Sequence, residues 1–184
     1  MLFARIRPIF LSLLMFLPII ASGLLVVLAE HNKAKHLRML VLSTNLSTFF
    51  AMVFVCWIAT LVYVLAPSFR SKFFAFAGLT IGVLFRLFED SITLDVLNVT
   101  GQIPILSFVS LDSPIFVMHV LVSLFMISLL VFLARWLIRK EKSLGFEEES
   151  KIKTILWFII FPVGIWFIQP RMRKILDEEK PVIE

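Results

Sequence analysis

The sequence predicts an all-α membrane protein, a polytopic bundle of helices that cross a lipid bilayer. Hydrophobic residues make up 60% of the chain and charged residues only 17%, whereas soluble domains are nearer half apolar and a quarter charged. The mean hydropathy is +0.98, and one soluble core of this size could not bury so much apolar surface. Uncharged runs of about 20 residues, the length of a membrane-spanning helix, recur along the chain.

The predicted organisation is a single integral membrane domain over residues 1–184, with four full spans and a shorter fifth apolar run. The apolar runs cover residues 8–29, 39–66, 73–88, 115–138 and 154–169, and a charged tail follows at 171–184. The polar links between the runs are too short to hold a folded domain outside the membrane. The link between the first two runs is short, so the first two helices are expected to form an antiparallel hairpin.

The first run follows Arg5 and Arg7, a pattern that cleavable signal peptides share. Ala21-Ser22-Gly23 is a weak match to a cleavage site, but the apolar run continues through Leu28. This run is longer than the apolar region of a signal peptide. We therefore interpret residues 8–29 as an uncleaved transmembrane helix.

The third run has two alternative ends, because Arg86, Glu89 and Asp90 follow its apolar stretch directly. In one interpretation the helix covers residues 73–88 and these charges lie at its mouth. In the other interpretation it continues to about residue 98, and Arg86 then lies within the membrane.

The fifth run, residues 154–169, would extend over only about 24 Å as a helix, less than the hydrocarbon core of about 30 Å. Pro162 and Gly164 interrupt it, and Pro170 is expected to end it. The run is predicted to be either a short fifth span or a re-entrant or interfacial helix. Residues of the kind that anchor a helix at the membrane surface accompany it, namely Trp157, Trp166, Arg171 and Arg173.

Basic residues predict a cytoplasmic N-terminus, because lysine and arginine collect on the cytoplasmic side. If the fifth run crosses the membrane, ten of the 18 basic residues lie inside. If it does not cross, fourteen of the 18 lie inside, and those outside are Lys33, Lys35, Arg38 and Arg86. The expected location is the plasma or inner membrane, and the formal charge of +5 is interpreted as contact with lipid headgroups rather than with nucleic acid.

Arg86, Glu89 and Asp90 are the first candidates for a polar site within the membrane. Their spacing of three and four residues places them on one helix face, and Asp95 joins the set if the helix continues. Ionisable groups inside a span usually pair with one another and face a bundle interior or a water-filled path. The functional interpretations are a proton relay, an ion or substrate site, or a headgroup anchor. The structural alternative is a helix end at which Arg86 reaches the interface.

Two further patterns indicate helix packing. Gly78 and Gly82 form a small-xxx-small pair, which lets another helix approach closely. The second span also carries a cluster of hydroxyl and amide side chains that often join helices by hydrogen bonds: Ser43, Thr44, Asn45, Ser47 and Thr48.

No metal site and no cofactor are predicted. His31, His36 and His119 are the histidines of the chain, and the proposed orientation places all three on the outer side. However, His31 and His36 are five residues apart, which is not a same-face helix spacing, and no other ligand pattern accompanies them. The single cysteine, Cys56, rules out an internal disulfide.

Three hypotheses for the function follow. The first is a non-catalytic accessory, assembly or scaffold subunit of a membrane complex, whose partners are other membrane subunits or a second copy of this chain. The second is a small transporter of a solute, ion or proton that uses the cluster around Arg86. The third is a membrane-embedded enzyme acting on a lipid-linked substrate, with Glu89 or Asp90 as acid or base. The scarcity of polar groups in the spans favours the first.

Overall fold

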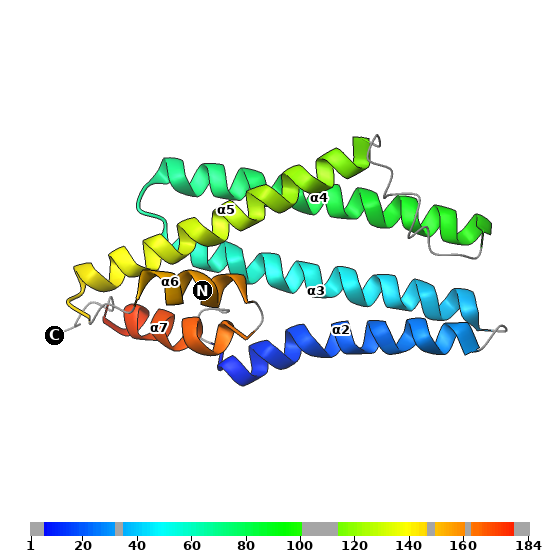
Figure 1. The fold of residues 1–184 in the computed structure, drawn as a ribbon, viewed down its shortest axis with the longest axis horizontal. Coiled ribbons are helices and arrows are strands. Elements are labelled where there is room, and N and C mark those ends of the chain that lie inside the picture. The colour runs from blue at the N-terminus through cyan, green and yellow to red at the C-terminus, as the bar shows by residue number, and fades with distance from the viewer. Residues whose placement is uncertain (1–5, 32–34, 101–113, 147–149, 161–162, 179–184) are drawn as a thin grey trace. The chain divides into compact units, whose positions relative to one another are not determined.

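The computed structural model describes residues 6–31, 35–100, 114–146, 150–160 and 163–178 (Figure 1). These residues form helices and short turns, with no strand among them. The helices in chain order are α2 (Pro8–His31), α3 (His36–Leu65), α4 (Phe69–Thr100), α5 (Pro114–Ser143), α6 (Lys151–Ile159) and α7 (Ile165–Glu178).

Four of these helices are long and apolar enough to cross a membrane, which confirms the predicted fold class. The segments concerned are Pro8–Ala29, His36–Leu65, Phe69–Leu97 and Phe116–Ser143, of 22, 30, 29 and 28 residues. At about 1.5 Å per residue, each exceeds the hydrocarbon core of about 30 Å.

The third span is one continuous helix, so the longer of its two predicted forms is the one observed. Helix α4 runs from Phe69 to Thr100 without interruption past Arg86. Proline and glycine are absent between residues 83 and 100, so nothing in this stretch breaks the helix. Arg86 therefore lies in the interior of the helix, with about 21 Å of helix between it and Lys72.

The chain divides into two compact units, and each long helix contributes to both. One unit contains residues 1–13, 56–77 and 126–184, and the other contains residues 14–55 and 78–125. We call them unit 1 and unit 2, respectively.

In unit 2, an apolar cluster forms where α2 ends, α3 begins and α4 ends. Ala29, Leu40 and Leu97 are its buried members, each at most 3% exposed. Earlier in α4, the two glycines of the small-xxx-small pair, Gly78 and Gly82, lie at different distances from the side chains of α5. A Cβ atom on Gly78 would lie on the ring of Phe125, whereas one on Gly82 would lie 3.7 Å from a methyl group of Val122.

This difference predicts unequal effects of alanine at the two glycines. Gly78→Ala is expected to lower the free energy of unfolding by about 1 to 3 kcal/mol, the usual cost of overpacking. Gly82→Ala is the matched control and should be neutral or slightly stabilising, since alanine favours the helix. Titration of the detergent-solubilised protein with SDS measures both effects, and Phe125→Leu should restore the Gly78→Ala variant. Equal stability of the two alanine variants would contradict the close contact at Gly78.

In unit 1, α6 and α7 lie side by side as a helical hairpin (Figure 1). The rings of Trp157 and Phe167 stack with their centroids 3.7 Å apart and their planes at 11°. Gly164 directly precedes the second arm, and a Cβ atom there would collide with the carbonyl oxygen of Trp157. Glycine is therefore required at this close approach of the two arms.

The apolar run at residues 154–169 is thus divided between two helices. A fifth membrane crossing in a single piece would require one continuous helix. The first part of the run, up to Ile159, forms the end of α6, and its last part, from Ile165, forms the beginning of α7. With nine and 14 residues, these helices extend over only about 14 and 21 Å.

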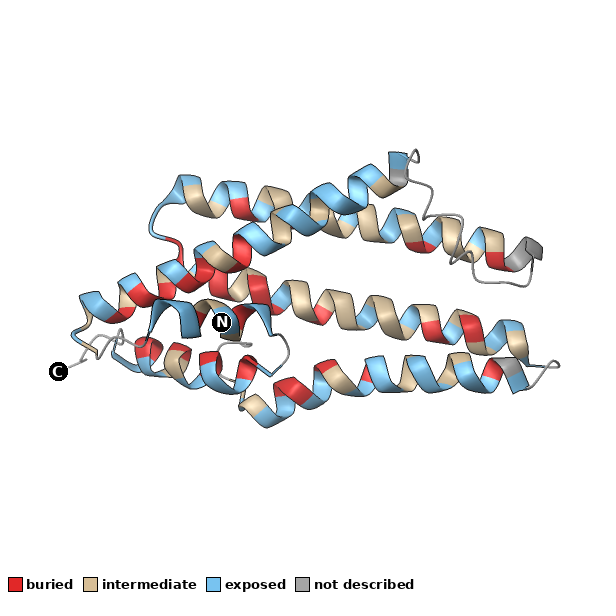
Figure 2. Cartoon of the chain, viewed as in Figure 1, coloured by how far each residue is buried: buried red, intermediate tan, exposed pale blue. Residues whose placement is uncertain are grey.

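The prediction that Pro170 ends the helix is wrong, because α7 continues through it to Glu178. The face of α7 that packs inward runs the length of the helix (Figure 2). Its buried residues are Ile165, Ile168, Gln169, Met172, Ile175 and Leu176. Pro170 lies on the opposite, exposed face, so burial of the apolar face outweighs the one backbone hydrogen bond that proline removes.

Candidate functional site

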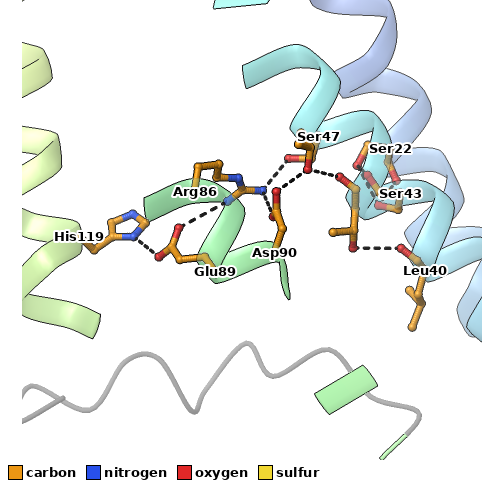
Figure 3. A network of polar contacts seen from close by, with 10 residues as sticks. Ser22, Leu40, Ser43, Ser47, Arg86, Glu89, Asp90 and His119 are labelled. Carbon is orange, nitrogen blue, oxygen red and sulfur yellow. Dashed lines mark hydrogen bonds and ion pairs between the residues drawn. The ribbon is translucent and has the colours of Figure 1, made fainter. Parts of the chain in front are cut away.

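The main polar site lies in unit 2 and is centred on Arg86 of α4 (Figure 3). Nη2 of Arg86 is 2.9 Å from Oδ1 of Asp90, and Nη1 is 3.8 Å from Oε2 of Glu89. Nη2 also donates a hydrogen bond of 3.3 Å to the hydroxyl of Ser47 on α3. One helix face thus brings a guanidinium between two carboxylates, as the spacing of three and four residues predicts.

Asp90 connects α4 to α3. Its carboxylate is 2.5 Å from the hydroxyl of Thr48, and the residue is 8% exposed. The same hydroxyl lies 3.0 Å from the backbone oxygen of Thr44. A hydroxyl has one proton, so it donates to one of these acceptors at a time. A buried carboxylate with both an ion pair and a hydroxyl donor is well compensated.

Glu89 connects α4 to α5. Its Oε1 is 2.8 Å from Nδ1 of His119, which donates the hydrogen bond when the carboxylate is ionised. The ring of Phe85 packs edge to face against His119, with centroids 6.1 Å apart. The side chain of Glu89 is 12% exposed, whereas that of His119 is 61% exposed. The network therefore extends from the buried Asp90 of α4 to the exposed His119 of α5.

A pair of serines extends the polar contacts to α2. The hydroxyls of Ser22 and Ser43 are 2.8 Å apart, and each lies 3.1 Å from the backbone oxygen of the other. Polar contacts thus join α2 to α3, α3 to α4 and α4 to α5 within unit 2 (Figure 3). We call the contacts of Ser47, Thr48, Arg86, Glu89, Asp90 and His119 the Arg86 network.

A second polar cluster, in unit 1, fixes the hairpin to α5. The guanidinium of Arg171 donates to both carboxylate oxygens of Glu141, at 2.6 Å from Nε to Oε1. It also donates to the hydroxyl of Thr154 on α6, at 3.0 Å. The side chains of Arg171 and Glu141 are 13% and 7% exposed. Arg171 is therefore a largely buried clamp between three helices, and its predicted role as an anchor at the membrane surface stays a prediction.

The end of α5 presents Glu141 to this cluster. Gly145, with φ of 74°, follows the last turn, and the backbone nitrogens of Gly145 and Phe146 donate to the carbonyls of Lys142 and Glu141. This pattern is a Schellman motif, which glycine favours because it adopts positive φ readily. The sequence signal for the clamp was present, since Glu141 is the one acidic residue in a strongly basic helix end.

Gln169 is a buried residue whose role the sequence did not indicate. It is fully buried on α7. Its Oε1 accepts a hydrogen bond of 3.1 Å from Nε1 of Trp57, and its Nε2 donates one of 3.3 Å to the backbone oxygen of Ile6. The side-chain amide of Gln169 has an acceptor oxygen and a donor nitrogen, and each of them has a hydrogen-bond partner here.

The remaining predicted site residues lie apart from these clusters. Asp95 is exposed on α4, and none of the described residues pairs with it. Trp157 stacks on Phe167, and its buried Nε1 finds no acceptor within the described part of the chain. Trp166 is 47% exposed, and Arg173 is partly buried.

The histidines do not come together. Nδ1 of His31 lies 2.9 Å from the backbone oxygen of Val27, and Nδ1 of His36 lies 2.9 Å from that of Ala29, whereas His119 contacts Glu89. Among the described residues, no three histidine, cysteine or carboxylate side chains are placed to hold a metal ion.

The chain matches no protein-family model, and no curated protein or solved structure is significantly similar to it. Its class therefore follows from the fold and the two polar clusters. It is a helical membrane protein with four helices that can each cross a bilayer.

Proposed function

We propose that the protein is a non-catalytic accessory or scaffold subunit of a membrane complex. The observation that carries this proposal is the exposure of two members of the Arg86 network, since the side chains of His119 and Arg86 are 61% and 35% exposed. His119 lies about 8 Å along α5 from Pro114, within the part of the helix that can cross the membrane. Lipid tails offer no hydrogen-bond partner to such groups. A polar residue of a partner subunit supplies one.

The limited burial of the long helices supports the same proposal. Between 11% and 33% of the most apolar window of each span is buried within the chain, with α4 the least buried. Few residues of α4 are therefore fully buried within the chain, and its exposed residues are available to lipid or to other subunits.

The proposal places the chain in the plasma or inner membrane as a multi-pass protein with a cytoplasmic N-terminus. Its support is the charge distribution. With a hairpin of α6 and α7 that does not cross the membrane, fourteen of the 18 basic residues lie on the cytoplasmic side.

A second candidate function is proton or ion transport through the same network. It is supported by the pairing of Glu89 with His119 at 2.8 Å, since carboxylate and imidazole groups within spans form proton relays in transporters. This candidate predicts flux into vesicles that contain the purified protein alone.

The decisive measurement is the mass and composition of the particle purified in mild detergent from its native membrane. We expect other membrane proteins in stoichiometric amounts. His119→Leu should reduce their recovery about tenfold, a loss of about 1.4 kcal/mol of binding energy, while the chain itself elutes as a folded monodisperse species. Leu17→Ala, at a position of α2 that is 67% exposed, is the control and should leave recovery unchanged. A particle that contains this chain alone would overturn the proposal.

A further inference from the structure

A basic groove lies in unit 1 between the last turns of α5 and the first turn of α6. It encloses about 520 Å³ and is lined by Arg135, Ile138, Arg139, Lys142, Lys151 and Ile155. Four of its six lining residues are cationic, two are isoleucines, and none is acidic. We refer to these six residues as the basic groove.

The α5 wall of the basic groove concentrates positive charge on one helix face. Arg135, Arg139 and Lys142 are separated by four and three residues, so they stack along α5. Like charges at this spacing repel one another. Arg135 and Arg139 are exposed, and no carboxylate of the described residues forms an ion pair with either. An anion in the groove would remove this repulsion.

The α6 wall adds a second source of positive potential. The first turn of α6 contains no acidic residue, and its N-cap Ser150 makes no side-chain hydrogen bond to it. Lys151 and Lys153 occupy that turn, although the free backbone N–H groups and the helix dipole favour negative charge there. The helix start and its lysines therefore both favour an anion.

The position and lining of the basic groove indicate which anion it fits. Arg135 is the first charged residue after the apolar stretch of α5, so the groove begins where hydrocarbon gives way to headgroups. Ile138 and Ile155 add apolar side chains to the lining of the groove. This combination suits an amphipathic anion, because a small free anion gains nothing from the isoleucines.

We propose that the basic groove binds the phosphodiester headgroup of an anionic phospholipid. The guanidinium groups of Arg135 and Arg139 donate paired hydrogen bonds to the phosphate oxygens, and Lys142 and Lys151 contribute further positive charge. The isoleucines contact the first carbons of the acyl chains. This site is independent of the Arg86 network, which belongs to unit 2.

The test is native mass spectrometry of the full chain in a neutral detergent with added lipid. We expect phosphatidylglycerol to remain bound and phosphatidylcholine, which has a phosphodiester but no net charge, to dissociate. Arg135→Gln/Arg139→Gln should weaken phosphatidylglycerol binding about tenfold to thirtyfold, because each basic residue strengthens binding to anionic lipid. Lys35→Gln/Arg38→Gln removes the same charge from exposed positions of unit 2 and should bind as the wild type does.

Lys151→Gln changes the other wall of the groove and should also weaken binding, so the test does not depend on the double variant folding. Equal retention of the two lipids by the wild type would overturn the proposal. Full displacement of phosphatidylglycerol by millimolar inorganic phosphate would overturn it as well, since the site would then recognise a free anion.

Discussion

Arg171→Met is expected to lower the free energy of unfolding by about 3 to 5 kcal/mol, the largest effect of any single substitution proposed for this chain. The substitution leaves Glu141, whose side chain is 7% exposed, as a buried charge without its bidentate partner. It also removes the hydrogen bond to Thr154, so α5, α6 and α7 lose their common contact. SDS titration of the protein in mixed micelles, followed by tryptophan fluorescence, measures the change.

Two further variants distinguish the effect of breaking the ion pair between Arg171 and Glu141 from the effect of removing any one positive charge. Lys153→Met removes an exposed cation of α6 that does not line the basic groove, and it should change stability by less than about 0.5 kcal/mol. Arg171→Met/Glu141→Leu replaces both partners by apolar groups and should recover most of the lost stability. If the free energy of unfolding of Arg171→Met lies within about 1 kcal/mol of the wild-type value, the clamp between Arg171 and Glu141 is not formed.

Asp90→Asn is expected to lower the free energy of unfolding by about 2 kcal/mol. The amide keeps the size of the side chain, but it gives up the charge that pairs with Arg86 at 2.9 Å, and hydrogen bonds to charged groups contribute about 1.5 to 3 kcal/mol. The same SDS titration measures this loss. Asp95→Asn is a matched control on the same helix, since Asp95 is exposed, and it should be nearly neutral.

The two proposed functions differ in what else Asp90→Asn does. If the protein is a scaffold subunit, the Asp90→Asn variant should be less stable, but the folded variant should still co-purify with its partner subunits. A transporter should lose flux even at temperatures where the variant stays folded. Equal stability of Asp90→Asn and Asp95→Asn would instead show that the contacts of Asp90 with Arg86 and Thr48 contribute nothing to the fold.

Local periodicity made much of the fold predictable. Apolar runs long enough to span a bilayer require helices there, because each backbone polar group must be satisfied within its own segment. The four membrane helices follow from this rule alone. The shared face of Arg86, Glu89 and Asp90 follows from helix geometry in the same way, since it depends only on residues within one turn.

The partners of that face could not be predicted, because they come from distant parts of the chain. Thr48 is 42 residues from Asp90, and His119 is 30 residues from Glu89. Spacing within a helix carries no information about which neighbouring helix packs against it, or at what height. The exclusion of Asp95 has a local origin instead, because a residue nine positions after Arg86 lies on the opposite face of a continuous helix.

The C-terminal hairpin shows the division most clearly. The sequence by itself determined that residues 154–169 are apolar, too short for an ordinary span and interrupted at Pro162 and Gly164. Only the tertiary structure decided that α7 continues through Pro170 and that Arg171 turns inward to Glu141. The reason is energetic: burial of one apolar face outweighs the local preference of proline to end a helix, and such burial exists only once α5, α6 and α7 are packed together.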